Sequence, residues 1–149
     1  MQIHCYRDIA AASIDELIER ISGIVSEVTG YRRDLILESL KKRESLSPTA
    51  IGKGVMLPHI RLEDIEDDYI FFLRLEKGLC YKSPDGSDIS FVFFIMSPLE
   101  KKGEYLRLVS AIVRMIKNDD LYNRISAITD SEELRKLLQT NLMSKGNTN

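Results

Sequence analysis

Residues 43–59 read RESLSPTAIGKGVMLPH, and this stretch decides how the rest of the sequence is interpreted. It opens with an arginine–glutamate pair where a helical pattern runs out, and its two glycines, Gly52 and Gly54, are typical of turns. It ends with His59 directly behind a proline. We expect these residues to form a loop between structured segments, with His59 as the first candidate for chemistry.

Two helices are expected before this stretch. Residues 13–29 carry apolar side chains at helical spacing. Ser13 is followed three residues later by a glutamate, which is the spacing of a capping box, and Gly30 is suited to end the helix in a left-handed conformation. A second helix is expected from about Arg32. Residues 1–12 have no decisive period, and we expect an edge strand or a docked arm there.

Strand patterns dominate the middle of the chain. Residues 69–75 are rich in aromatic and β-branched side chains. Residues 89–96 are almost continuously apolar, as expected for a central strand covered on both faces. Turns are expected at Gly78 and at residues 84–86.

Helical patterns return after the strands. They cover residues 103–117 and 121–128, and Asp130 is expected to cap a last helix. Helices therefore flank a group of strands, and the natural packing places helices on both faces of a small sheet. We expect an α/β fold in which residues 1–149 form one domain and residues 144–149 a disordered tail.

The composition excludes several classes of function. The chain has 149 residues, of which 44% are hydrophobic and 30% charged, as in ordinary globular domains. Its formal net charge is −2, so no basic field favours nucleic acid. Cys5 and Cys80 lack the spacing of a metal site, and the longest apolar run, residues 91–96, is too short to cross a membrane. We expect a cytoplasmic protein with no metal site, no nucleic-acid partner and no direct membrane insertion.

His59 is the residue that best supports chemistry, because common enzyme signatures are missing. The sequence has no GxGxxG after a strand, no P-loop, no HExxH and no GxSxG. A neutral imidazole is a nucleophile at cellular pH and accepts a phosphoryl group as well as a proton. A phosphoryl site also needs backbone N–H donors and a cation, for which Gly52, Gly54 and Arg43 are candidates. From the residues alone, a lone histidine in a loop is more often a surface residue than a nucleophile.

The same stretch resembles the signature of a known family. The stretch has an arginine–glutamate pair at residues 43–44, a Thr-Gly-Ile-Gly-like turn at residues 49–52 and an apolar run ending in Pro58-His59. These features are similar to the motif of phosphotransferase-system (PTS) IIA domains of the mannitol/fructose/nitrogen-regulatory class. The order of the surrounding elements is similar over nearly the whole chain. The resemblance implies the IIA mannitol/fructose-type fold, a mixed sheet between helices.

The resemblance also implies a function. His59 would accept a phosphoryl group from an HPr-like phosphocarrier protein as a tele-phosphohistidine and pass it to a IIB domain, which phosphorylates a sugar. Arg43 would neutralise phosphoryl charge, Glu44, Thr49 and residues 52–54 would shape the pocket, and no cofactor is required. The alternative is a nitrogen-regulatory IIA module, which binds partner proteins according to the phosphorylation state of His59.

A few positions depart from the family pattern. Members usually carry a second histidine directly before a leucine in the helix after the buried strand, and here that pair is Tyr105-Leu106. A phenol donates a hydrogen bond but does not become cationic near neutral pH. Ala50 and Ile60 replace a glycine and a small residue. A binding domain without phosphoryl chemistry is therefore a third hypothesis, and neither the sugar nor the oligomeric state follows from the sequence.

Overall fold

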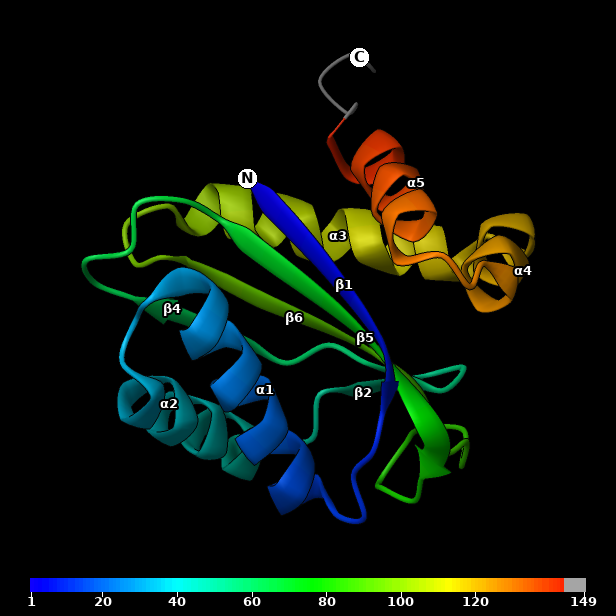
Figure 1. Cartoon of the computed structure of the whole chain (residues 1–149), viewed down its shortest axis with the longest axis horizontal. Coiled ribbons are helices and arrows are strands. Elements are labelled where there is room, and N and C mark those ends of the chain that lie inside the picture. Colours follow the sequence, from blue (N-terminus) through cyan, green and yellow to red (C-terminus); the bar gives the residue numbers. More distant parts are fainter. Residues whose placement is uncertain (144–149) are drawn as a thin grey trace.

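A computed structural model describes residues 1–143, which form a six-stranded sheet and five helices (Figure 1). The strands are β1 (Gln2–Ile9), β2 (Ala50–Gly52), β3 (Val55–Met56), β4 (His59–Leu62), β5 (Tyr69–Leu79) and β6 (Ile89–Pro98). The helices are α1 (Ile14–Thr29), α2 (Arg33–Leu46), α3 (Lys102–Lys117), α4 (Asp119–Ala127) and α5 (Ser131–Met143). The tail expected at residues 144–149 lies outside the described residues.

The sheet is mixed, and β6 pairs with more strands than any other strand of residues 1–143. The order is β1-β5-β6-β3-β2, and β4 pairs with β6 further along the same edge that β3 uses. β5 is antiparallel to β6, whereas β1 is parallel to β5, and β3 and β4 are parallel to β6. The predicted α/β fold with a mixed sheet is confirmed. The first residues form the edge strand that was one of the two expectations for them.

Helices cover both faces of the sheet, so each face carries its own apolar core. Alternate residues of a strand point to opposite faces. Phe71 and Phe94 pack with α1 and α2, whereas Phe72 and Phe93 pack with α3, α4 and α5. Figure 1 shows these two groups of helices on different sides of the strands. Burial on both faces explains why residues 89–96 are apolar without alternation.

The first helix begins and ends where its capping residues predict. The Ser13 hydroxyl accepts a hydrogen bond from the Glu16 amide at 3.1 Å, and Gly30 adopts a left-handed conformation with φ 80°. Leu17 and Ile21 are completely buried on the inner face of α1. Local sequence signals were sufficient to predict this helix, because its apolar stripe and its two capping residues indicate the same bounds.

Residues 43–59 do not form the expected loop. α2 continues to Leu46, residues 50–56 form a β-hairpin, and His59 is the first residue of β4. Strands as short as β2, β3 and β4 are too brief to display an alternating pattern, so they exist only through their pairing with β6 and with each other. The prediction of an irregular loop was therefore wrong.

The turn expected at Gly78 is also absent. β5 continues through Gly78 to Leu79, with a shift of register against β6 after Arg74. A Cβ on Gly78 would approach the Asp88 side chain to 3.0 Å, so glycine here allows close packing of the extended strand. The chain turns instead at residues 84–86, as predicted.

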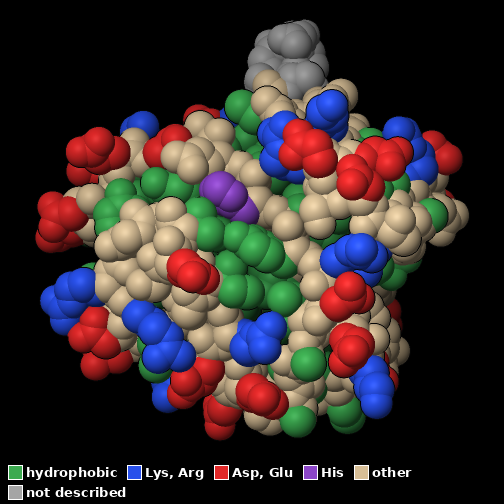
Figure 2. Space-filling view, viewed as in Figure 1, with side chains coloured by type: hydrophobic (Ala, Val, Ile, Leu, Met, Phe, Trp, Pro, Cys, Tyr) green, Lys and Arg blue, Asp and Glu red, His purple; other side chains and the backbone are tan. Residues whose placement is uncertain are grey.

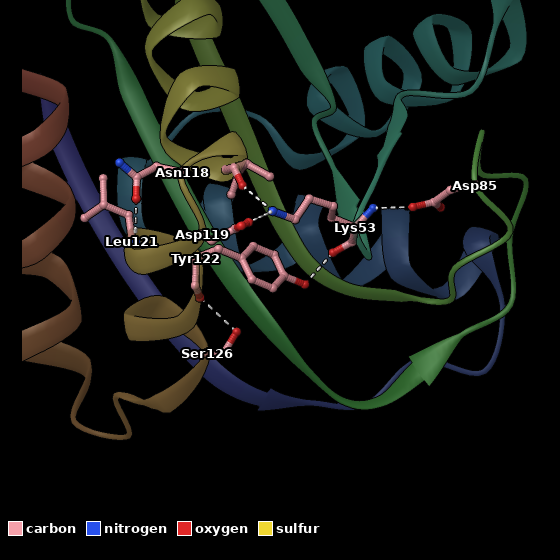
Figure 3. A network of polar contacts seen from close by, with 8 residues as sticks. Lys53, Asp85, Asn118, Asp119, Leu121, Tyr122 and Ser126 are labelled. Atoms are coloured by element: carbon pink, nitrogen blue, oxygen red, sulfur yellow. Dashed lines mark hydrogen bonds and ion pairs between the residues drawn. The ribbon is translucent and has the colours of Figure 1, made fainter.

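Lys53 ties the β2–β3 hairpin to the helical layer (Figure 3). Lys53 and Gly54 both have positive φ, 57° and 74°, as a two-residue type I′ hairpin turn requires. Lys53 Nζ donates to the Ile116 carbonyl at the end of α3 (2.9 Å) and pairs with Asp119 (3.2 Å). The Tyr122 hydroxyl donates to the Lys53 carbonyl at 2.5 Å. Because a helix C-terminus favours a cation, this lysine stabilises the junction of α3 and α4 as well as the hairpin.

The described residues do not meet the requirements of a membrane-spanning helix or of a metal-binding cluster of acidic, histidine or cysteine side chains. Within residues 1–143, every helix is too short or too polar to cross a bilayer. In the same residues no group of three or more His, Cys, Asp or Glu side chains is placed to hold a metal ion. Figure 2 shows basic and acidic side chains interspersed over the face seen in Figure 1, so neither charge forms an extended patch there.

Candidate functional site

His59 lies where the end of α2, the strand β4 and the first turn of α3 meet. β4 pairs with β6, and its register places His59 opposite Ile95. Ile60 is buried in the core with 5% of its surface exposed, whereas His59 and Arg61 are partly buried on the other face of the strand. Alternation along β4 therefore points the imidazole and the Arg61 side chain to the same side.

The contacts of His59 determine which ring nitrogen carries the proton. Arg43 Nε donates a hydrogen bond to His59 Nε2 at 3.1 Å, and His59 Nδ1 lies 3.4 Å from the Leu57 carbonyl. A guanidinium has no acceptor, so Nε2 must carry the lone pair. The proton is then on Nδ1, and the Leu57 carbonyl accepts a hydrogen bond from it. The neutral imidazole thus presents Nε2 as its nucleophilic atom.

The surroundings of His59 favour this neutral form. Burial lowers the pKa of the imidazole below its ordinary value, and the positive charges of Arg43 and Arg61 lower it further. The Leu57 carbonyl and the Glu44 carboxylate raise the pKa, but each has a smaller effect than burial or Arg43. At neutral pH the side chain is consequently unprotonated at Nε2 and able to attack an electrophile.

The imidazole borders a pocket of about 480 Å³ with a basic lining. Its walls are Ser39, Lys42, Arg43, Leu46, His59, Ile60, Arg61, Leu99 and Tyr105. Three of these side chains are cationic, and among the described residues no carboxylate lines the pocket. A pocket with this lining is complementary to an anion such as a phosphoryl group.

Tyr105 is brought to the histidine by α3. Its ring centroid lies 4.9 Å from that of His59, and the Arg61 guanidinium lies 5.8 Å from the Tyr105 ring. Burial raises the pKa of the phenol, against the opposing charges of Arg43 and Arg61. Tyr105 therefore keeps its proton at neutral pH and can donate one hydrogen bond, but it adds no positive charge.

Glu44 and Thr49, both predicted pocket residues, support His59 from behind instead of lining the pocket. The buried Glu44 carboxylate accepts hydrogen bonds from the Thr49 amide and hydroxyl, both at 2.8 Å, and from the Tyr81 hydroxyl at 2.6 Å. The Thr49 carbonyl accepts from the Leu57 amide at 3.0 Å. Since the Leu57 carbonyl faces His59 Nδ1, this chain of contacts holds the ring in position.

Gly52 and Gly54, predicted to cradle the phosphoryl group, lie away from the histidine. Val55, which follows Gly54, pairs with Phe91 of β6. Phe91 is four residues from Ile95, the partner of His59, which is roughly 13 Å along an extended strand. The Gly54 amide donates to Ser87 and the Lys53 amide to Asp85. The amides of Lys53 and Gly54 therefore already donate to side chains of the protein, and Gly52 and Gly54 form part of the hairpin turn.

Arg61 is the functional candidate that sequence reasoning missed. Its side chain lines the pocket and donates to the Leu99 carbonyl at 3.0 Å. The signal that was present is the spacing, since a basic residue two positions after His59 shares its face if the segment is a strand. In a loop, side chains two positions apart have no fixed relation, so the spacing identifies Arg61 only once the segment is known to be a strand.

Comparison with known proteins identifies a matching family and a relative. The family model described as "Phosphoenolpyruvate-dependent sugar phosphotransferase system, EIIA 2" matches residues 3–141. The nitrogen regulatory protein of Bradyrhizobium diazoefficiens is 27% identical over 123 residues, which cover 83% of this chain and 80% of that protein.

Solved structures share the fold. The nitrogen regulatory protein IIA-Ntr from Neisseria meningitidis superposes with a TM-score of 0.84 at 24% identity, covering 91% of this chain and 92% of that chain. Enzyme IIAMtl in its complex with phosphorylated enzyme IIBMtl from Escherichia coli gives a TM-score of 0.74 at 17% identity, covering 91% and 93%. At these identities the structural similarity establishes the fold.

Proposed function

The chain belongs to the EIIA 2 family of the phosphoenolpyruvate-dependent sugar phosphotransferase system, and from this premise we propose that it is a cytoplasmic phosphoryl carrier that uses His59 Nε2 as the acceptor atom. The donor is an HPr-like phosphocarrier protein, and the recipient is a IIB domain. No cofactor takes part. The observation that carries the proposal is the unprotonated Nε2 at the border of the pocket. Three cationic side chains line this pocket, and among the described residues no carboxylate does.

The geometry supports a simple displacement at phosphorus. The Nε2 lone pair forms the new P–N bond while the P–N bond of the donor phosphohistidine breaks, and that electron pair returns to the donor ring. The proton on Nδ1 stays against the Leu57 carbonyl, so His59 needs no external base. Phosphoryl transfer depends mainly on positioning and on neutralising the charge of the oxygens. Arg43, which covers Nε2 in the free protein, would move its hydrogen bond to a phosphoryl oxygen.

Exposed apolar side chains suit the rim of the pocket to protein partners. Leu46 and Leu99 line the pocket with 74% and 43% of their surface exposed, and Leu106 follows Tyr105 with 51% exposed. Large apolar side chains that are exposed close together on a surface often mark a site that binds proteins. The proposal places the donor and the recipient in turn on this rim, with their phosphorylated side chains in the pocket.

The test is phosphorylation of the purified protein by the general phosphotransferase components and phosphoenolpyruvate, followed by intact mass spectrometry. We expect the mass of one phosphoryl group to be added to wild type and not to His59→Ala. His4→Ala is the matched control, because His4 is the other of the two histidines in the chain. Absence of the added mass from wild type, or its persistence in His59→Ala, would refute the proposal.

A regulatory role is the second candidate function. It is favoured by the relative from Bradyrhizobium diazoefficiens, which is named a nitrogen regulatory protein and matches 83% of this chain. In such a role the phosphorylation state of His59 would control the binding of a partner protein, with no sugar transported. Transfer from phosphorylated His59 to an added IIB domain supports the carrier role. A partner that binds wild type, His59→Ala and His59→Asp equally would argue against a switch.

A further inference from the structure

Arg43 and Arg61 both face the His59 pocket, and neither has an acidic partner among residues 1–143. Arg43 donates to His59 Nε2 and to the Ser47 carbonyl, and Arg61 donates to the Leu99 carbonyl. Within residues 1–143 neither guanidinium belongs to an ion pair. A partly buried guanidinium usually meets a carboxylate or another anion. Two of them beside one neutral imidazole leave positive charge available to a ligand.

The positions of the two guanidiniums differ in a way that matters for transfer. Arg43 is engaged with the lone pair of Nε2, the atom that must attack phosphorus. Arg61 leaves that lone pair free, because its described contacts are the Leu99 carbonyl and the face of Tyr105. It is nevertheless close enough for its charge to lower the pKa of His59.

Arg61 also has the capacity to bind an oxyanion. A guanidinium has five N–H donors, and one contact to a carbonyl leaves most of them free. The contacts with Leu99 and the Tyr105 ring restrict the side chain to the pocket, which reduces the entropy lost when an anion binds. The Tyr105 ring, 4.9 Å from His59, forms a common wall for both side chains.

On these grounds we propose that Arg61 is a second phosphoryl-binding residue, which holds the incoming group while Arg43 still covers Nε2. This inference rests on the proposed carrier function. Arg61 binds phosphoryl oxygens on the side of Tyr105, and Arg43 binds them after leaving Nε2. Arg61 carries the permanent positive charge of a guanidinium, which the Tyr105 phenol cannot supply.

The experiment compares wild type with Arg61→Gln, Arg61→Lys and Arg114→Gln. Arg114 is an exposed residue of α3, so its replacement gives the same change of net charge at a distance from the pocket. Binding of inorganic phosphate is followed by the NMR shifts of the His59 ring, and the rate of phosphorylation is measured with a limiting amount of phosphorylated HPr-like donor. The titration of His59 is recorded in the same samples.

Arg61→Gln is expected to weaken phosphate binding and slow phosphorylation by about 10- to 100-fold, the size of one lost charge-assisted hydrogen bond. Arg61→Lys should recover part of the rate, and Arg114→Gln should behave as wild type. The pKa of His59 should rise slightly in Arg61→Gln, because a nearby positive charge is lost, and stay unchanged in Arg114→Gln. Weaker phosphate binding together with partial rescue by Arg61→Lys is the response that a purely structural role would not give.

Two outcomes separate the two proposals. If wild type is phosphorylated and Arg61→Gln matches it in rate and in phosphate binding, the role of Arg61 is refuted and the carrier function stands. If wild type is never phosphorylated but binds phosphate in a manner that requires Arg61, the carrier function is refuted and Arg61 remains an anion-binding residue.

Discussion

Replacement of Glu44 is expected to damage both stability and the site, because one carboxylate satisfies several donors at once. It accepts from the amide and hydroxyl of Thr49 and from the hydroxyl of Tyr81, and 9% of the residue is exposed. Thr49 in turn holds the amide of Leu57, whose carbonyl faces His59 Nδ1. Glu44→Ala removes the acceptor at the base of this chain.

The loss can be estimated from the three hydrogen bonds. Leaving the buried Thr49 amide without an acceptor costs about 1–3 kcal/mol, and losing the charge-assisted bond from its hydroxyl costs about 1.5 kcal/mol. Tyr81 is partly exposed, so its hydroxyl can turn to water and adds little. We expect Glu44→Ala to lower the free energy of unfolding by about 3–4 kcal/mol.

Glu44→Gln is the matched control for this change. Its amide oxygen can take the place of Oε2 and accept from the Thr49 amide and the Tyr81 hydroxyl, while its NH₂ group donates to the Thr49 hydroxyl oxygen. All three contacts are kept and only the charge is lost, which should cost about 1 kcal/mol.

Thermal and urea unfolding measure the difference. For a chain of this size, about 3–4 kcal/mol corresponds to a fall in Tm of roughly 10 °C. Nitrogen NMR of His59 should show one tautomer in wild type and Glu44→Gln, and a mixture in Glu44→Ala. If Glu44→Ala unfolds within about 1 kcal/mol of Glu44→Gln and keeps a single tautomer, the supporting role of this carboxylate is refuted.

Three further predictions concern pH, the phenol and the hairpin. The pKa of His59 is below its ordinary value of 6.5, so the phosphorylation rate and the stability contributed by the neutral ring should persist above pH 6.5 and fall only below it. Arg43→Gln should raise this pKa and shift the loss of rate to higher pH. An unchanged pH profile of the rate would contradict the role of the Arg43 charge. Tyr105→Phe, assayed with a phosphorylated HPr-like protein, should slow transfer by about 2- to 10-fold, the effect of losing one neutral hydrogen bond. A loss beyond about 100-fold would mean that the phenol contributes more than one hydrogen bond to transfer. Gly54 has a φ of 74°, and a Cβ added there would lie 3.1 Å from the Asp88 carbonyl oxygen. Gly54→Ala should therefore lower the free energy of unfolding by about 1–3 kcal/mol and leave the phosphorylation rate unchanged. A stable variant that transfers slowly would show that the hairpin takes part in phosphoryl binding.

Local patterns in the sequence were sufficient for the helices and the principal strands. The apolar stripe of residues 13–29 agrees with its caps, and the apolar run of residues 89–96 lies in a strand buried on both faces. Such patterns depend on residues a few positions apart, so they survive without tertiary information. The resemblance at residues 43–59 likewise identified the family and drew attention to His59 and Arg43, which the structure joins by a hydrogen bond.

Contacts that depend on strand register were decided by the tertiary structure alone. His59 and Arg61 share one side of β4, a strand too short to be predicted from its pattern. Tyr105 contacts His59 because the chain passes from β6 into the first turn of α3 beside the start of β4. Gly52 was a candidate to provide a backbone N–H donor to the phosphoryl group, but the β2–β3 hairpin and the pairing of β3 with β6 place it away from the histidine. Sequence patterns report which residues are apolar and where helices begin, because those properties are local. Contacts across the sheet depend on register, and register is set by the packing of the whole chain.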